Sequence, residues 1–505
     1  MWRRISIVAI LTVFCGVIVP AQSAEKQAAE KEEIPVLEDS ISETRHAIEI
    51  NGTRIEYTAL AGTMVLRDEE KKPRASVFFV SYLRDGVEDL GRRPITFTFN
   101  GGPGSSSVWL HLGAFGPKRV LMEDEGFPLP PPYKLVENRE SLLDLTDLVF
   151  IDPVTTGYSR TAPGQDPNQF HGVTEDVESV GEFIRLFLTR YRRWASPKFL
   201  AGESYGTTRA AGLSGHLQER HGIYLNGIIL VSSVLNFQTL LFDTGNDLPY
   251  VLFLPSYTAA AWYHKQLEPG LQQDLARTLA LAEEFAAGDY TLALMKGSRL
   301  GEDETERTAR QLARFTGLSQ DFVMRSNLRV SASRFFKELL RGQGETTGRL
   351  DSRFVGTDID SVGERVEYDP SMAAITGPYT AMLNDYVRRD LQFESDLPYE
   401  ILTNRVRPWN FGNAENRYLD VAETLRRAMN ENRDLKIFVG SGYYDLATPY
   451  FATDYTFSHL GLVPELGSNI QTSYYEAGHM MYIRKKSLEK LKADLVLFYQ
   501  SALPE

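Results

Sequence analysis

The first part of the chain alternates hydrophobic and polar residues, a pattern typical of strands with one buried face. Residues 45–61 alternate around Asn51-Gly52, which is a two-residue hairpin signal. Residues 75–83 and 94–99 follow as further runs rich in β-branched and aromatic residues. We expect these three segments to form the antiparallel start of a sheet.

The pattern changes downstream, where strand and helix segments alternate. Apolar runs at residues 148–151, 198–201 and 227–231 predict strands. Helical periodicity at residues 173–194 and 205–221 predicts the helices between them. Such alternation implies parallel strands joined by helical crossovers.

Residues 237–405 break this rhythm with mostly helical, aromatic-rich sequence. The earlier pattern resumes with predicted strands at residues 435–439 and 469–475, followed by a final amphipathic helix. The simplest account is one discontinuous α/β domain, residues 41–236 and 406–505, with residues 237–405 inserted as a largely helical cap.

The first 24 residues have the layout of a cleaved secretory signal peptide. Arg3 and Arg4 precede an apolar run over residues 5–19, and small residues follow up to Ala24. A membrane anchor is the alternative, but the run is shorter than the roughly 20 residues of a spanning helix. A lipid anchor on Cys15 would leave little apolar sequence ahead of the processing point. We therefore expect an exported protein, periplasmic or secreted, without a stable membrane anchor after cleavage, while the export route stays open.

Composition and charge narrow the function classes. The formal net charge is −13 and becomes about −15 without Arg3 and Arg4, which disfavours binding to nucleic acid or anionic lipid. The basic residues between positions 484 and 492 recur at helical spacing and are expected to form the solvated face of the final helix. Cys15 is the only cysteine, so the mature chain forms no disulfide. Residues 25–40 are charged and aperiodic, which predicts a mobile lead-in, and nothing in the sequence indicates an oligomeric state.

One pentapeptide, Gly202-Glu203-Ser204-Tyr205-Gly206, lies between a predicted strand and a predicted helix, the context of a nucleophile elbow. A strand that turns directly into a helix forces strained backbone at the serine, and only small neighbours let the chain pass closely. A plain Gly-Ser loop is the alternative, but the flanking strand and helix favour the elbow. The motif predicts the α/β-hydrolase fold, a mixed and mostly parallel sheet flanked by helices, with residues 41–236 and 406–505 as its catalytic domain.

A serine nucleophile needs a base, and the base needs a carboxylate that holds its tautomer. In this fold the three residues follow in the order Ser, Asp, His. Asp445 comes after the predicted strand at residues 435–439, and His479 comes after the one at residues 469–475. A turn aspartate and a packed loop histidine are the alternatives for these two residues. The only other histidine after Asp445 is His459, which falls in a predicted helix, so we predict Ser204, Asp445 and His479 as a catalytic triad.

A glycine-rich segment, residues 100–107, directly follows the predicted strand at residues 94–99. A developing oxyanion needs backbone N–H groups aimed at it, and glycine lets the backbone approach closely. We predict Gly102 and Tyr205 as the two donors of an oxyanion hole. The segment lacks the Gly-Lys-Ser/Thr of a phosphate loop, and no histidine or carboxylate cluster has zinc spacing, so neither a cofactor nor a metal is predicted.

These motifs resemble those of the serine carboxypeptidase family of α/β-hydrolases. The resemblance runs in order over roughly residues 75–500 and is carried by Asn100-Gly101-Gly102-Pro103-Gly104, by Phe150-Ile151-Asp152-Pro153 with Thr156-Gly157-Tyr158-Ser159, by the elbow, and by Gly478-His479-Met480. It implies removal of C-terminal residues from peptides that have a free C-terminus. It also implies that Asn100, Gly101 and Glu203 bind the substrate, with Asn100 and Glu203 gripping its terminal carboxylate.

The chain departs from the family's pattern in two places. The family commonly has a cysteine where Ser105 stands, and several disulfides, which this mature chain cannot form. A second glutamate, which in the family pairs with the one before the nucleophile, is replaced by Ala114 in Gly113-Ala114-Phe115-Gly116-Pro117. The resemblance therefore implies a simplified carboxylate clamp.

Two other interpretations stay open. Acyltransferases of the same family use the same triad to pass an acyl group to an alcohol, and a generic esterase has the same elbow. The alternative of another class is a non-catalytic binding protein on a hydrolase scaffold. That alternative requires the loss of a triad residue, and all three are present in this chain.

Overall fold

The computed structural model describes residues 37–414 and 417–503. The predicted signal peptide, residues 1–24, and residues 25–36 of the predicted lead-in lie outside these residues. Among the helices of the described part, none is long and apolar enough to cross a membrane. The described residues form one compact unit.

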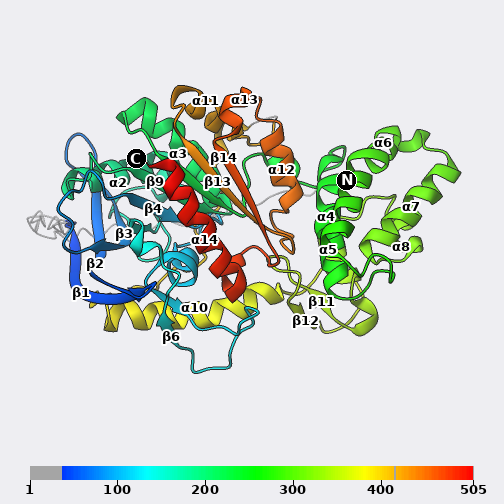
Figure 1. Cartoon of the computed structure of the whole chain (residues 1–505), viewed down its shortest axis with the longest axis horizontal. Coiled ribbons are helices and arrows are strands. Elements are labelled where there is room, and N and C mark those ends of the chain that lie inside the picture. Colours follow the sequence, from blue (N-terminus) through cyan, green and yellow to red (C-terminus); the bar gives the residue numbers. More distant parts are fainter. Residues whose placement is uncertain (1–36, 415–416, 504–505) are drawn as a thin grey trace, which may run out of the picture. The chain divides into compact units, whose positions relative to one another are not determined.

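A single sheet organises this unit, in the strand order β1-β2-β3-β7-β4-β9-β10-β13-β14, with β8 paired to β3 (Figure 1). Its strands are β1 (Ser40–Ile50), β2 (Thr53–Arg67), β3 (Pro73–Arg84), β4 (Ile95–Phe99), β7 (Asp147–Ile151), β8 (Arg160–Thr161), β9 (Lys198–Glu203), β10 (Gly227–Val231), β13 (Lys436–Gly442) and β14 (Ile470–Tyr475). Two short pairs lie outside this sheet, β5 (Lys118–Val120) with β6 (Leu135–Glu137) and β11 (Thr346–Thr347) with β12 (Val355–Gly356).

The antiparallel start of the sheet confirms the predicted hairpin. Strands β1 and β2 pair in a register that brings Ile50 opposite Thr53, so Asn51 and Gly52 form the turn. Both turn residues have positive φ, 50° and 74°, as the tight turn of a two-residue hairpin requires. Strand β3 then pairs antiparallel with β2.

Strand β4 corrects the prediction that residues 94–99 belong to the antiparallel start. It lies in the middle of the sheet and pairs parallel with both β7 and β9. All five of its residues are buried. A strand that is buried on both faces is a continuous apolar run whether it pairs parallel or antiparallel, so its sequence does not show which strands it pairs with.

The parallel strands β7, β4, β9, β10, β13 and β14 carry helices on both faces. The helices that pack on the sheet are α2 (Val173–Arg190), α3 (Tyr205–His221), α10 (Pro370–Arg389), α11 (Ala422–Glu431) and α14 (Lys485–Ala502), and shorter ones are α1 (Val108–Leu110), α12 (Tyr450–Ser458) and α13 (Pro464–Gly467). Alternate residues of β10 enter two different cores: Ile229 packs with α10 and α14, and Ile228 packs with α2, α3 and α11. The carboxyl ends of parallel strands meet at one edge of a sheet, so the segments that follow β4, β9, β13 and β14 are brought together there.

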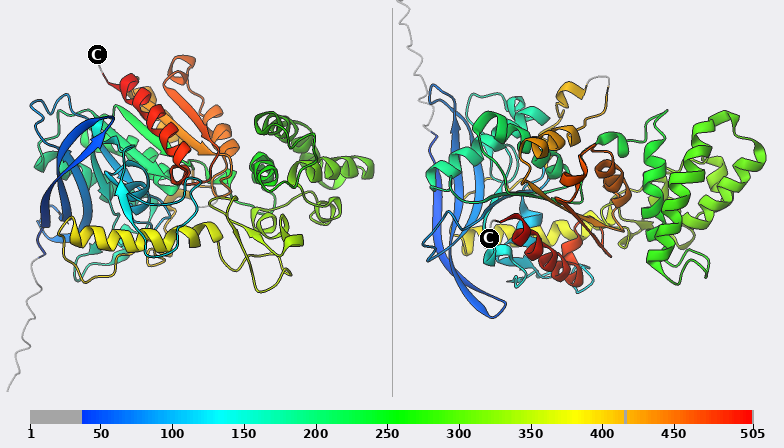
Figure 2. Two further views of the ribbon diagram at one scale, coloured as in Figure 1. Left: turned by 60° about the horizontal axis from the view of Figure 1, so that its bottom comes forward. Right: turned by 45° about the horizontal axis from the view of Figure 1, so that its top comes forward.

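The inserted region is helical, as predicted, and has two parts. Residues 248–340 build their own hydrophobic core from α4 (Leu248–Tyr263), α5 (Leu275–Phe285), α6 (Thr291–Lys296), α7 (Glu302–Thr316), α8 (Gln320–Arg325) and α9 (Ala332–Glu338). Figure 2 shows these green helices gathered in one group. Helix α10 instead joins the core on one face of the sheet through Tyr379, Leu383 and Tyr386. The cap boundaries of 237–405 remain a prediction, although only the first part packs as a separate cluster.

Helix α14 confirms the predicted final helix and corrects one detail of its charged face. Lys485, Lys486 and Lys490 are exposed, but Lys492 is buried. Its Nζ donates to the backbone oxygen of Ser141 at 2.6 Å and forms an ion pair with Asp144. Helical spacing shows which face a residue occupies, but not whether a distant turn covers that face.

Candidate active site

The sharp turn between β9 and α3 positions Ser204. Its backbone has φ 60° and ψ −129°, a conformation that non-glycine residues rarely adopt and that costs about 1–3 kcal/mol. The turn is held by the Ser204 amide, which donates to the Val231 oxygen at 3.0 Å. A Cβ on Gly202 would lie 2.2 Å from the Gly206 oxygen, so only glycine fits there. The sequence Gly-x-Ser-x-Gly therefore folds as the predicted elbow, with Ser204 half-buried in the wall of a cavity.

Asp445 and His479 lie side by side at the same sheet edge. Asp445 is fully buried after β13, and its Oδ2 is 2.7 Å from His479 Nδ1. The other carboxylate oxygen accepts the amides of Ala447 at 2.7 Å and Thr448 at 3.0 Å, which fixes the orientation of the carboxylate. Burial by itself lowers the pKa of His479, but the adjacent Asp445 charge and hydrogen bond outweigh it and raise the pKa above its ordinary value. An imidazole held this way, on the same cavity as Ser204, can act as a base towards it.

The glycine-rich segment after β4 lies against the elbow. A Cβ on Gly101 would fall 2.4 Å from the amide nitrogen of Tyr205. Gly102 has φ 102°, a conformation that favours glycine. Tyr205 is the first residue of α3, so its N–H has no acceptor within the helix and is available to a ligand. The two predicted oxyanion donors are therefore on neighbouring stretches of backbone.

A second sequence motif, residues 150–159, anchors this segment. Asp152, which follows β7, accepts the amide of Ser107 through Oδ1 at 2.8 Å. Its backbone oxygen accepts the Ser159 hydroxyl at 2.6 Å. A Cβ on Gly157 would collide with the Asp152 carboxylate at 1.7 Å. The residues from Asp152 to Ser159 thus hold the glycine-rich segment in place rather than face the cavity.

Glu203 and Asn100 stand beside the predicted nucleophile and are both buried. Burial raises the pKa of Glu203 to about 7, although the nearby His479 charge and a 2.5 Å hydrogen bond from the Tyr482 hydroxyl to Oε2 act in the opposite direction. Asn100 Oδ1 accepts the Leu110 amide at 3.0 Å. Its Nδ2 lies near enough to Glu203 to lower that pKa slightly, but it makes no hydrogen bond in the described part of the chain. The pair offers one unused amide donor and one carboxyl group that is protonated in part at neutral pH.

Ala114, where the family's pattern has a second glutamate, lies buried in a π-helical turn, His111–Phe115. The neighbouring Gly113 abuts two tyrosines: a Cβ there would lie 2.5 Å from the Tyr482 ring and 2.7 Å from the Tyr379 hydroxyl. The Tyr482 hydroxyl is the group that reaches Glu203. A phenol donor therefore accompanies Glu203 in place of a second carboxyl group. Tyr482 follows His479 by only three positions, but no sequence motif singles it out.

The cavity that joins these groups has a volume of about 380 Å³. It is lined by the predicted Asn100, Gly101, Gly102, Glu203, Ser204 and His479, and also by residues that sequence analysis did not single out, among them Trp109, Arg349, Met372, Ile375, Leu402 and Arg407. His459, the alternative histidine, is exposed at the end of α12 and bonds to Tyr455. Among the described residues, no group of three or more His, Cys, Asp or Glu side chains is arranged to hold a metal ion.

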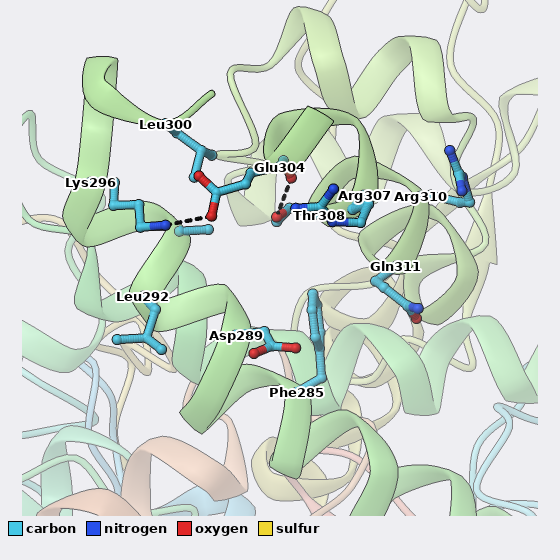
Figure 3. A pocket seen from close by; sticks show the side chains of 11 residues that line it. Phe285, Asp289, Leu292, Lys296, Leu300, Glu304, Arg307, Thr308, Arg310 and Gln311 are labelled. Atoms are coloured by element: carbon cyan, nitrogen blue, oxygen red, sulfur yellow. Dashed lines mark hydrogen bonds and ion pairs between the residues drawn. The ribbon is translucent and has the colours of Figure 1, made fainter. Parts of the chain in front are cut away.

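A separate cavity of about 400 Å³ lies within the helical insertion (Figure 3). Its wall includes Asp289 and Leu292 from one side and α7 from the other, and Lys296 and Glu304 form an ion pair there. None of the predicted site residues lines this cavity.

Comparison with known proteins places these features in context. A sequence model of the family described as serine carboxypeptidase matches residues 65–491. The pheromone-processing carboxypeptidase KEX1 of Yarrowia lipolytica is 27% identical over 177 residues, which are 34% of this chain and 26% of that protein. Serine carboxypeptidase-like 35 of Arabidopsis thaliana is 25% identical over 197 residues, which are 37% of this chain and 38% of that protein. The matched part thus spans less than two fifths of either relative.

One solved structure extends the comparison over nearly the whole chain. The prohormone-processing carboxypeptidase of Saccharomyces cerevisiae has a TM-score of 0.54 at 16% identity, covering 88% of this chain and 91% of that one. At this identity the similarity shows the fold. It confirms the predicted α/β-hydrolase architecture of a mixed, mostly parallel sheet with helices on both faces.

Proposed function

The chain belongs to the serine carboxypeptidase family, and from this premise we propose that it is an exported serine carboxypeptidase acting on peptides with a free C-terminus. The observation that carries the proposal is the cavity at the sheet edge, where Ser204 and His479 open onto the same space as Asn100 and Glu203. A hydrolytic serine and a site for a carboxylate are thus next to each other.

The proposed reaction uses Ser204, His479 and Asp445 as one unit. Ser204 Oγ attacks the carbonyl carbon of the last peptide bond while His479 takes its proton, and the Gly102 and Tyr205 amides stabilise the oxyanion. His479 returns the proton to the leaving amine as the C–N bond breaks, which leaves an acyl ester on Ser204. A water deprotonated by His479 then attacks the ester carbon, and the bond from this carbon to Ser204 Oγ breaks as His479 returns the proton to Oγ. The shortened peptide leaves with a new carboxyl group.

Glu203 and Asn100 are proposed to recognise the C-terminus. An ionised Glu203 would repel the substrate carboxylate, whereas a protonated one donates a hydrogen bond to it. Burial holds the pKa of Glu203 at about 7, and an arriving carboxylate raises it further. The unused Nδ2 of Asn100 is a second donor. Because His479 must be neutral and Glu203 protonated, activity is expected to peak near neutral pH and to fall on both sides.

A peptide with a free carboxyl terminus is expected to be cleaved about 10- to 100-fold faster than its C-terminal amide, because the amide cannot form the charged hydrogen bonds. Glu203→Gln keeps a donor at every pH, so it should flatten the alkaline decline in kcat/KM for the free acid. The measurement is kcat/KM from pH 5 to 9 for both peptides, in wild type and variant, with products identified by mass. Equal cleavage of both peptides at every pH, or cuts at internal bonds, would remove the carboxypeptidase assignment and leave a serine hydrolase.

Tyr482→Phe is expected to move the alkaline limb of the same profile upward by roughly one pH unit. The Tyr482 hydroxyl donates to Glu203 Oε2 and so stabilises the ionised carboxylate. Without that donor the pKa of Glu203 rises, and the protonated form persists to higher pH. Tyr379→Phe is the matched control, because Tyr379 is also buried next to Glu203 but makes no hydrogen bond to it. An unchanged limb in Tyr482→Phe, or equal shifts in both variants, would contradict this role.

The esterase, acyltransferase and binding-protein alternatives draw no specific support from the geometry. An esterase needs no buried carboxyl and amide pair beside its serine, and a binding scaffold needs no intact aspartate–histidine pair. The peptide measurements above distinguish a carboxypeptidase from each of these three alternatives, because only a carboxypeptidase releases single residues from the C-terminus.

A further inference from the structure

A second cavity of about 730 Å³ continues from the active-site cavity. Gly102, Pro103, Arg349 and Arg407 line both spaces, so the two meet beside the proposed oxyanion donor. Beyond that junction the wall is mostly apolar and aromatic, with side chains such as Phe237, Leu240, Phe242, Phe253, Phe336 and Trp409. We refer to this second cavity as the aromatic groove.

The junction carries two cations that the fold leaves without partners. Arg349 and Arg407 are exposed, and neither guanidinium forms an ion pair or hydrogen bond with any described residue. Arg405, two positions from Arg407, shows the contrast: it lines neither cavity and pairs with Glu400 at 3.1 Å. In a chain of net charge −13, two unpaired arginines at one cavity junction are a local reversal of charge.

The lining of the groove adds to this reversal. No aspartate or glutamate lines it, and the only carboxyl group in the active-site cavity is that of Glu203. Apart from Glu203, which is protonated in part at neutral pH, the residues that line the two cavities therefore supply no negative charge to balance the arginines. A cation that lines a cavity favours a ligand that carries a carboxylate.

The residues that line each of the two joined cavities indicate which part of the peptide substrate each cavity holds. This step rests on the proposed function. Asn100 and Glu203, the proposed carboxylate site, line only the first cavity, so the leaving residue occupies that space. The aromatic groove meets this cavity at Gly102 and is left for the residues that stay on the acyl side of the scissile bond.

We propose that Arg349 and Arg407 select peptides with an acidic side chain on the N-terminal side of the scissile bond, beside an apolar residue held in the aromatic groove. The selected substrates are thus acidic-apolar C-terminal sequences. Arg407 is the better residue to test, because Arg349 also lowers the pKa of His479 through its charge, and replacing it would alter the base.

The test uses N-acetylated tetrapeptides with a fixed C-terminal leucine and with Glu, Gln or Lys at each of the two preceding positions. Wild type is expected to prefer Glu over Gln by about three- to tenfold at one of these positions, mainly through KM, and Lys should be the poorest. The preference should shrink in 0.5 M NaCl, because the arginines are exposed. Arg407→Glu should invert the order to Lys over Glu, whereas the matched control Arg405→Glu should leave it unchanged.

Three results would overturn the proposal. The first is an equal kcat/KM for Glu, Gln and Lys at both positions. The second is a Glu preference that survives in the double variant Arg349→Gln/Arg407→Gln. The third is a loss, in that double variant, of the discrimination between free-acid and amide peptides. The last result would show that the arginines hold the terminal carboxylate. Failure of the proposed function is a separate outcome, seen as internal cuts or as equal cleavage of acid and amide. In that event, binding of dansylated Glu, Gln and Lys peptides to Ser204→Ala, followed by fluorescence anisotropy, still measures the charge preference.

Discussion

Replacing Ser204 with alanine is expected to lower kcat by about 10⁴-fold or more, and His479→Ala should do about the same. In the proposed reaction, Ser204 supplies the attacking oxygen and His479 is the base, and His479 Nδ1 lies 2.7 Å from Asp445 Oδ2. Because both act in the same step, the double variant should be little worse than either single one. Single-turnover and steady-state kinetics on an N-blocked dipeptide give these values.

His459→Ala is the matched control, because His459 is exposed at the end of α12 and lines no part of the active-site cavity. Its activity should stay within about twofold of wild type. A serine-directed phosphonate should label wild type and not Ser204→Ala. Near-native activity of Ser204→Ala, together with no labelling of the wild type, would reject the triad.

Arg209→Met is expected to lower the free energy of unfolding by about 3–5 kcal/mol at pH 7. Arg209 is fully buried, and its Nε donates to Asp176 Oδ2 at 2.7 Å. Its Nη1 donates to the backbone oxygen of Asn100 at 2.6 Å, and the guanidinium lies over the rings of Phe99 and Tyr205. Methionine fills similar volume but leaves a buried carboxylate unpaired. The same change frees the start of the glycine-rich segment.

The loss should depend on pH in a predictable direction. Burial raises the pKa of Asp176 above its ordinary value even with Arg209 present, and removal of Arg209 raises it further. A carboxyl group with a raised pKa in the folded state destabilises the fold at any pH above its unfolded pKa of about 4. This cost decreases as the pH falls through the folded pKa, because the group then becomes protonated and neutral. The difference between variant and wild type should therefore shrink from pH 7 to pH 5.

Urea unfolding at both pH values measures this difference, with Arg427→Met as the control. Arg427 pairs with Glu219, and both side chains are about half exposed, so its replacement should cost less than about 1 kcal/mol. Equal losses in the two variants, or a loss in Arg209→Met that does not change with pH, would contradict the buried-pair argument.

Local rules explain why much of the chain could be predicted from its sequence. Asn51-Gly52 supports a turn with two positive φ angles. Gly202 and Gly206 lie so close at the turn around Ser204 that a Cβ on Gly202 would collide with the Gly206 backbone. Periodicity located most strands and helices because it reports which faces are buried. The rule that parallel strands end at one edge then grouped Ser204 and His479, and the structure places both on one cavity.

Pairings between distant segments were decided only by the tertiary structure. Strand β4 lies between β7 and β9 rather than in the antiparallel start, and Lys492 is covered by a turn near Asp144. Tyr482 reaches Glu203 across 279 positions, which no local pattern encodes. The reason is physical. The hydrophobic or charged character of a residue indicates whether its side chain is buried or solvated, whereas the side chain that it contacts depends on how the whole chain packs. The sequence by itself therefore determined most elements and the turn at Ser204, and it predicts the triad. Only the packed fold decided the partners of Glu203 and the two unpaired arginines beside the aromatic groove.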